Sequence, residues 1–302
     1  MEASNRPLII GLGEVLWDLL PGGKQFGGAP ANFAYHAKAM GAEGVVVSCV
    51  GDDDLGREIL DRLDGLGLGR EYVAVDPKHP TGTVSVELDA DGKPDYIIHE
   101  PVAWDFIPKG PALDELAAKT DAVGFGSLAQ REGVSRATIQ HFLAATRPDC
   151  LRIFDINLRQ HFYNRDTITA GLEAASVLKL NDEELPVVAE LLSIEGDESA
   201  VLATLIEQFS LRLIALTKGA QGSVLATADE RSEHPGFAAE VSKSDGADTV
   251  GAGDSFTAVL AMGLLRGLEL DTINERANRT ACYVCGQAGA TPEMPAELTE
   301  LA

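Results

Sequence analysis

The chain has 302 residues, 45% of them hydrophobic, and a formal net charge of −23 at pH 7. A charge this negative argues against nucleic acid and anionic membranes as partners, because both repel an acidic protein. No apolar run reaches the length that spans a bilayer. Residues 1–6 lead directly into a short apolar strand and do not resemble a signal peptide. We expect a cytoplasmic protein built as one large domain.

The N-terminal part predicts a strand followed by a polar turn and a helix entrance. The strand begins at residues 8–10, and we expect Asp18 at its polar end. Residues 27–33, GGAPANF, open a helix with two glycines and an early proline. Gly28 and Asn32 would suit close contact with a polyhydroxylated ligand. An ordinary strand–helix loop explains the same residues, since Gly and Pro mark most loops.

Residues 81–100 interrupt the strand–helix pattern. Apolar positions alternate with polar ones from residue 83 to residue 88, a turn follows at Asp91-Gly92, and residues 96–98 are again apolar. This alternation with turn residues in between predicts a β-hairpin. An antiparallel hairpin does not fit easily into a parallel sheet, so we expect it in a second, small sheet.

We expect this small sheet to form a lid on a single domain of residues 1–302. The lid would consist of excursions around 14–26 and 72–105. One of its apolar faces would need cover, which suggests a homodimer that joins lid to lid. Trp104, in the segment that returns to the main body, would either pack over a ligand or anchor the hinge.

From residue 122 onward, predicted strands alternate with predicted helices. Such alternation indicates an α/β fold with a mostly parallel sheet covered on both faces. Ligands of these sheets bind beyond the carboxyl ends of the strands. The polar residues at predicted strand ends are Asp18, Asn157, Arg159, Asn181, Glu184 and Thr217.

Residues 248–256, DTVGAGDSF, precede an apolar helical run. Gly251 and Gly253 permit a tight turn that exposes backbone N–H groups, and a helix start attracts anions such as phosphate. Asp254 lies at that positive end. It could accept the proton of a hydroxyl that attacks a bound phosphoryl group. It could equally cap the helix, and this segment alone leaves both interpretations open.

Three motifs together resemble those of the ribokinase-like (PfkB) carbohydrate kinases. They are DTVGAGDSF at 248–256, the glycine-rich segment at 27–33 and the NxxE spacing from Asn181 to Glu184. The resemblance covers nearly the whole chain, and residues 13–21, 26–34 and 81–105 are most similar to fructokinases. It implies a three-layer α/β/α sandwich with a small β-sheet lid.

The resemblance also implies roles for individual residues. Asp254 would be the catalytic base, and the N–H groups of Gly251, Ala252 and Gly253 would form the anion hole. Asp18, Gly28 and Asn32 would bind sugar hydroxyls, with Trp104 beside them. Arg159 would be the cation that an acidic phosphate-binding protein requires.

For the nucleotide, the resemblance implies ATP with Mg²⁺. The residues concerned are Asn181, Glu184, Thr217, Gly219, Gly222 and Asn278. Glu184 would hold the magnesium through water. Asp248 and Val250, with backbone from residues 284–293, resemble a monovalent-cation site that would take K⁺.

We therefore expect a kinase that converts fructose to fructose 6-phosphate. A kinase for 2-keto-3-deoxygluconate would need a cation near residues 18–32, where Lys24 is available. A nucleoside kinase would need an aromatic platform, and Trp17, Phe26 and Phe33 could supply one. Ribose kinase activity and a non-catalytic sugar-binding regulator are further alternatives. A dehydrogenase is disfavoured because Leu16 breaks the GxGxxG pattern that begins at residue 11.

Overall fold

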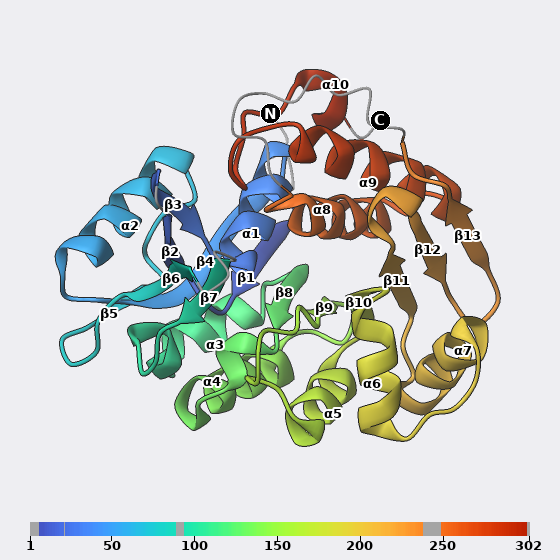
Figure 1. The fold of residues 1–302 in the computed structure, drawn as a ribbon, viewed down its shortest axis with the longest axis horizontal. Coiled ribbons are helices and arrows are strands. Elements are labelled where there is room, and N and C mark those ends of the chain that lie inside the picture. Colours follow the sequence, from blue (N-terminus) through green and yellow to red (C-terminus); the bar gives the residue numbers. More distant parts are fainter. Residues whose placement is uncertain (1–5, 21, 89–93, 238–248, 301–302) are drawn as a thin grey trace.

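The computed structural model describes residues 6–20, 22–88, 94–237 and 249–300. A nine-stranded sheet forms its centre (Figure 1). Its strands are β1 (Leu8–Leu12), β4 (Glu43–Gly51), β5 (Val73–Asp76), β8 (Ala122–Gly126), β9 (Leu151–Asp155), β10 (Val177–Asn181), β11 (Leu213–Thr217), β12 (Ser223–Ala226) and β13 (Arg231–His234).

The strand order is β13-β12-β11-β10-β9-β8-β1-β4-β5. All neighbours from β5 to β11 are parallel, and only the pairs β11–β12 and β12–β13 are antiparallel. The carboxyl ends of the parallel strands therefore meet at one edge of the sheet, where an α/β fold binds its ligands.

Helices cover both faces of this sheet, which confirms the three-layer α/β/α architecture (Figure 1). One face carries α1 (Ala29–Ala39), α2 (Asp54–Leu66), α8 (Ala252–Leu265) and α9 (Leu270–Cys285). The other carries α3 (Pro111–Ala117), α4 (Gly133–Ala145), α5 (Arg165–Ala174), α6 (Glu184–Leu192) and α7 (Glu198–Phe209). The short elements are α10 (Ala296–Thr299) and the 3₁₀ turns η1 (Ala103–Phe106), η2 (Leu128–Gln130) and η3 (Gly219–Gln221). In the part of the chain that is described, no helix has the length and apolar character needed to cross a bilayer.

A second sheet of four strands confirms the small sheet expected from the sequence. Its order is β3-β2-β6-β7, from β2 (Leu16–Leu20), β3 (Gly23–Gly27), β6 (Gly82–Leu88) and β7 (Pro94–Ile98). The antiparallel pair β6–β7 is the expected hairpin, and its turn at Asp91-Gly92 lies outside the described residues. β5, although it falls within residues 72–105, joins the large sheet beside β4.

The structure corrects the position of Asp18. It lies in the middle of β2, paired with Gln25 and Val84, and not at the carboxyl end of β1. The reason is a break at Gly13, whose φ of 149° is a conformation that favours glycine. The chain leaves the large sheet there and begins a new strand, so a segment that resembles one strand with a polar end forms two.

The two faces of the small sheet have different neighbours. Trp17 donates a hydrogen bond from Nε1 to the carbonyl oxygen of Leu55 in α2, at 3.0 Å. Lys24 pairs with Glu58 of the same helix and lies over the Trp17 ring. Because side chains alternate along a strand, Asp18 is on the opposite face. Lys24, the cation that the sequence offers near residues 18–32, therefore points away from Asp18.

A buried ion pair joins the returning segment to the main body. Asp105 of η1 is completely buried and accepts hydrogen bonds from Nε and Nη2 of Arg131, at 2.7 and 2.8 Å. The Arg131 guanidinium lies 4.0 Å from the centroid of the Trp104 ring. Trp104 is only 1% exposed. Its surroundings favour the hinge-anchoring interpretation over direct contact with a ligand.

We predict that Asp105→Ala destabilises the protein by about 3–5 kcal/mol, because Arg131 would then be a buried charge without its partner. Equilibrium urea unfolding measures this loss. Arg57→Ala, which removes an exposed arginine paired with Asp52 and Asp54, is the matched control and should leave the unfolding midpoint almost unchanged. Equal midpoints for wild type and Asp105→Ala would contradict the prediction.

Candidate active site

The first turn of α8 lies at the ligand-binding edge of the large sheet. Gly251 precedes the helix with a φ of 80°, and no side chain caps the helix start. The first N–H groups of a helix have no carbonyl partner within it and carry partial positive charge. The backbone of Ala252 and Gly253 is therefore suited to hold an anion. Asp248 lies outside the described residues, and Val250 is 42% exposed just before the turn.

Asp254 is half-buried in this first turn, and its carboxylate is oriented by another helix. Its Oδ2 accepts a hydrogen bond from Nδ2 of Asn32, at 2.8 Å. Asn32 lies in the first turn of α1 and is 2% exposed. This contact connects the two glycine-rich motifs of the sequence. It favours the proton-accepting interpretation of Asp254 over the capping one, because the carboxylate is bonded to α1 and caps no N–H group of α8.

The environment of Asp254 raises its pKa to about 6. Burial is the main cause, and the negative charge of Asp155 adds to it. The hydrogen bond from Asn32 and the charges of Lys179 and Arg159 act in the opposite direction. A carboxylate with a raised pKa is a stronger base than an ordinary aspartate and is still mostly ionised at pH 7.

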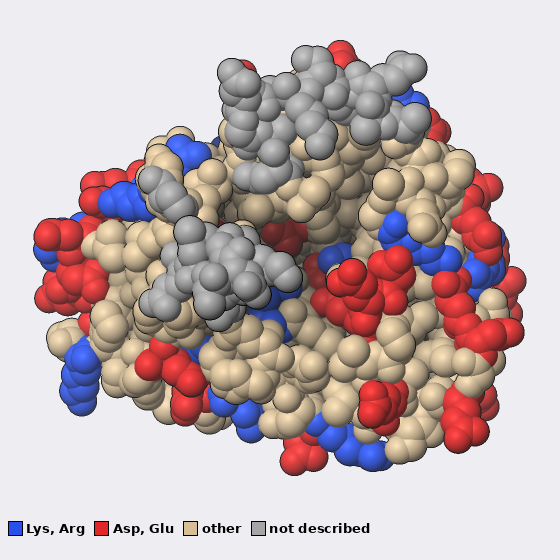
Figure 2. Space-filling model, viewed as in Figure 1, with Lys and Arg blue, Asp and Glu red and all other residues tan. Residues whose placement is uncertain are grey.

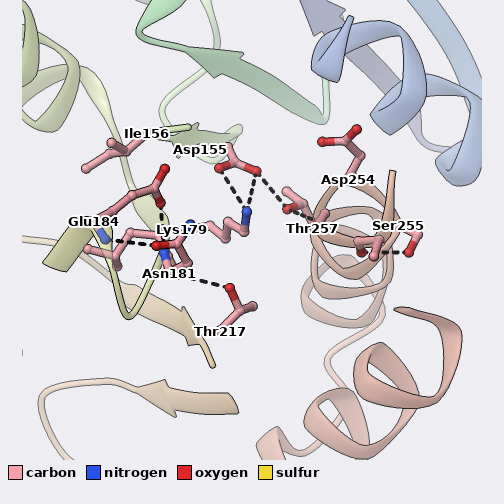
Figure 3. Close-up of polar contacts among 12 residues, drawn as sticks. Asp155, Ile156, Lys179, Asn181, Glu184, Thr217, Asp254, Ser255 and Thr257 are labelled. Carbon is pink, nitrogen blue, oxygen red and sulfur yellow. Dashed lines mark hydrogen bonds and ion pairs between the residues drawn. The ribbon is translucent and has the colours of Figure 1, made fainter. Parts of the chain in front are cut away.

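A buried lysine, which the sequence analysis missed, lies beside the same turn. Lys179 of β10 pairs in register with Asp155 of β9, and its Nζ is 3.0 Å from Oδ2 of that aspartate (Figure 3). The Thr257 hydroxyl donates to the same Oδ2 at 3.3 Å. A β-carbon added to Gly253 would lie 3.0 Å from Lys179 Nζ, so the ammonium group is next to the first turn of α8.

The Lys179 side chain is protonated and positively charged. Burial lowers the pKa of Lys179, but the charges of Asp155, Glu184 and Asp254 outweigh it, and the net shift is upward. The sequence contains a usable signal, because a single lysine and a single aspartate stand in adjacent apolar strands. A buried charge requires a partner, so such a pair indicates a contact.

The NxxE motif connects two strand ends. Asn181 Oδ1 accepts hydrogen bonds from the backbone N–H groups of Glu183 and Glu184, at 2.9 and 2.8 Å. The Glu184 oxygens accept from the N–H groups of Leu158 and Asn181, each at 2.8 Å. Burial, together with the charge of Asp155, raises the pKa of Glu184. Each carboxylate oxygen has a further lone pair, so Glu184 retains the capacity to bind water.

The other residues expected at the nucleotide side are spread over the ends of β11 and β12. Thr217 ends β11 and donates to the Leu180 carbonyl at 3.4 Å. Gly219, in η3, has open space beside its α-carbon. Gly222 has a φ of 84° and packs against the backbone of residues 234–236. Asn278 is 8% exposed and donates to Ser223 Oγ at 2.7 Å, within a buried polar network.

On the acceptor side, Gly28 packs closely against the loop between β1 and β2. Its φ is 114°, and a β-carbon there would lie 3.0 Å from the α-carbon of Val15. Glu14, in this loop, is buried, and its Oε2 has no hydrogen-bond partner within the described part of the chain. Burial is the main cause that raises the pKa of Glu14 to about 7. No sequence motif indicates this carboxyl group. Arg159 is exposed, in the loop after β9.

A pocket lies between α1, the end of β8 and the start of α8. It is lined by Ala29, Pro30, Phe33, Gly124, Phe125, Gly126, Asp155, Asp254 and Thr257. The space-filling view shows a hollow on this side, with charged side chains of both signs at its floor (Figure 2). The site thus combines a half-buried carboxylate, an uncapped helix start and a buried ammonium group.

Divalent metal ions of the magnesium type bind oxygen ligands and usually retain several waters. The carboxylates of Asp155 and Glu184 provide such oxygens close to Lys179. Within the described ranges, no cluster of three or more metal-binding side chains is present. This donor set fits an ion that is shared with bound phosphates and water, and not an ion enclosed by protein alone.

Comparison with known proteins agrees with this geometry. The model of the pfkB family of carbohydrate kinases matches residues 21–297, so the chain belongs to the PfkB family of carbohydrate kinases. A putative sugar kinase of Pyrococcus horikoshii is 26% identical over 275 residues, which cover 88% of this chain and 83% of that protein. Fructokinase of Klebsiella pneumoniae is 30% identical over 264 residues, which cover 84% and 83% of the two chains.

Solved structures show the same fold. The crystal structure of the Pyrococcus horikoshii kinase aligns with a TM-score of 0.78 at 26% identity, and covers 94% of this chain and 93% of its own. Fructokinase from Xylella fastidiosa, solved with bound ATP, aligns with a TM-score of 0.82 at 21% identity, and covers 95% of each chain. The fold and the kinase class expected from the motifs are confirmed.

The raised pKa of Asp254 has a consequence for stability. A carboxyl group whose pKa is higher in the folded state favours folding below its unfolded pKa of about 3.8, and this contribution is lost as the pH rises through about 6. We predict that Asp254→Asn, which removes the ionised form, raises Tm by a few degrees at pH 8 and by less at pH 5. Thermal unfolding at the two pH values measures this difference. A Tm below that of wild type at pH 8 would contradict it.

Proposed function

We propose that the protein is an ATP-dependent kinase that phosphorylates a primary hydroxyl group of a ketohexose, converting fructose to fructose 6-phosphate. The observation that carries the proposal is the position of Asp254 in the uncapped first turn of α8, bonded to Asn32 and close to Lys179. Relatives named fructokinase across most of the chain support the choice of acceptor.

In the proposed reaction, an acceptor hydroxyl attacks the γ-phosphorus of ATP and its proton passes to Asp254. A new bond forms between the acceptor oxygen and phosphorus, and ADP leaves with the electrons of the bond that breaks. The N–H groups of Gly251, Ala252 and Gly253 and the positive helix end would stabilise the charge on the transferred group. Catalysis of this type depends mainly on position and electrostatics.

Two cations of the chain would support the transfer. Lys179, buried beside Gly253, is placed to neutralise phosphate charge, whereas Arg159 approaches from the exposed loop after β9. Asp155 and Glu184 would hold Mg²⁺ through water, and the ion would supply further positive charge at the phosphates. The K⁺ site remains part of the proposal, with Val250 and the undescribed Asp248 as its residues.

Asp18, Gly28 and Asn32 would bind the acceptor, together with the buried carboxyl group of Glu14. The structure weakens two alternatives. Lys24 is paired with Glu58 on the opposite face from Asp18, so it does not offer a cation for 2-keto-3-deoxygluconate. A nucleoside would lose two of its three candidate aromatic residues, because Trp17 bonds to Leu55 of α2 and Phe26 packs against the Trp17 ring. Phe33 lines the pocket beside Asp254.

Exclusion of water is the role we propose for the small sheet. Water could otherwise accept the phosphoryl group, and lids commonly close over such sites. The cleft face of this sheet carries Asp18, so closure would bring a sugar-binding group toward α8. A homodimer formed through the lid and a location in the cytoplasm belong to the same proposal. Analytical ultracentrifugation of the full chain tests the dimer.

The test of the base is Asp254→Asn. We expect binding of sugar and ATP to persist while kcat falls by about 10³-fold or more, because the amide cannot accept the proton. Ser193→Ala, at the carboxyl end of α6, is a control outside the site and should retain activity. Near wild-type turnover of Asp254→Asn would show that another group is the base.

The identity of the acceptor is tested by a coupled assay of ADP release with a panel of compounds. The panel contains neutral hexoses and pentoses, sugar acids and nucleosides. We expect the highest kcat/KM for fructose. A higher value for ribose, a nucleoside or 2-keto-3-deoxygluconate would replace fructose by that acceptor. Sugar binding without ADP release for any compound would instead favour a non-catalytic regulator.

A further inference from the structure

Helix α1 contacts the proposed catalytic centre at two places that lie one turn apart. Asn32 donates its hydrogen bond to Asp254. Four residues later, His36 makes a 2.9 Å hydrogen bond from Nε2 to the carbonyl oxygen of Ala290, in the segment after α9. Residues spaced by four lie on the same face of a helix. One face of α1 therefore holds both Asp254 and the segment that contains Ala290.

Ala290 lies directly against the phosphate-binding turn. A β-carbon added to Gly251 would be 2.7 Å from the α-carbon, the β-carbon and the carbonyl oxygen of Ala290. Such distances are too short for any side chain, so the backbone of Gly251 is in contact with Ala290. Both residues are buried. A shift of Ala290 would consequently move or release the turn that begins α8.

The protonation state of His36 is determined by its surroundings. The Ala290 carbonyl can only accept, so Nε2 carries the hydrogen and donates it. His36 is completely buried, and Nδ1 has no hydrogen-bond partner among the residues described. Burial is the main cause that lowers the pKa of His36 to about 4. The imidazole is thus neutral at physiological pH and has no part in proton transfer.

We propose that His36 is a positioning residue, which holds Ala290 against Gly251 and so fixes the N–H groups of the phosphate-binding turn relative to Asp254. Because Asn32 and His36 belong to one helix, α1 holds both the Asp254 carboxylate and the segment that packs against Gly251. This inference rests on the proposed function of that turn. It predicts that losing the Nε2 donor harms phosphoryl transfer more than acceptor binding.

The decisive comparison is between three substitutions at residue 36. His36→Gln places an amide N–H close to the position of Nε2 and should retain the bond to Ala290. His36→Asn is too short to reach it, and His36→Phe keeps the ring without a donor. Small displacements of reacting groups cost up to about 10²-fold in rate. We expect kcat to fall about 10- to 100-fold in His36→Asn and His36→Phe, with an unchanged KM for the acceptor and recovery in His36→Gln.

A second measurement does not depend on turnover. Calorimetry gives the Kd of ADP and of a non-hydrolysable ATP analogue, and the ratio of the two reports how well the γ-phosphate is held. We expect this preference for the analogue to shrink in His36→Asn and to persist in His36→Gln. Tyr283→Phe is the matched control, because Tyr283 Oη donates to the Glu293 carbonyl of the same segment, farther along the chain. It should keep both kcat and the ratio.

The outcomes separate the two proposals. If wild type binds the analogue but phosphorylates no acceptor, the proposed function fails, and the Kd ratio of the variants still tests His36. If His36→Asn keeps the wild-type kcat and Kd ratio, His36 has no positioning role. Equal losses in His36→Gln and His36→Asn would likewise overturn the inference, because the donor would then not be what matters. Should His36→Phe fail to fold, the comparison of Gln with Asn carries the test.

Discussion

The uncapped start of α8, with Asp254 in its first turn and Lys179 beside it, is the constraint on which this molecule depends. The protein carries 47 acidic and 24 basic residues, so its overall field repels phosphate. Affinity for an anion must therefore come from local groups that act over short distances. The first turn of α8 supplies backbone N–H groups, and Lys179 supplies a full charge whose partner, Asp155, keeps it buried. Residues that orient this turn matter as much as those that would touch a ligand.

The layout of the chain follows from this constraint. Asp155, Lys179 and Asn181 lie at one edge of the sheet, because each is at or near the carboxyl end of a parallel strand, β9 or β10. α1 and α8 pack side by side on one face, which brings Asn32 to Asp254 across a sequence separation of 222 residues. The fold thus assembles, from distant short motifs, a centre in which the charge of each group modifies the basicity of its neighbours.

Local sequence patterns predicted the elements well, because the strands and helices have strong apolar periodicity and glycines stand in the turns between them. The motif residues Asp254, Asn32 and Glu184 could be found because their local surroundings are distinctive. Lys179 and His36 are not distinctive in their local surroundings, since their roles arise from partners in other elements. For Lys179 the signal lies in comparing its strand with the neighbouring strand that carries Asp155, and His36 has no such signal. Asp18 was identified as a site residue but placed at the end of the wrong strand. The break at Gly13 is a matter of backbone conformation, and a glycine in a strand-like segment does not show from sequence whether it will turn.

The strand pairing of the small sheet has a consequence for how the protein folds. β2 and β6 are parallel neighbours, but β3, α1, β4, α2 and β5 lie between them in the chain. Contacts between segments so far apart in sequence form slowly, because a long loop must close before they yield any stabilisation. We therefore expect the half of the cleft that carries Asp18 to form late in folding. Completion of the small sheet and positioning of the first turn of α8 therefore both depend on contacts between distant parts of the chain, the first joining β2 to β6 and the second joining α1 to α8.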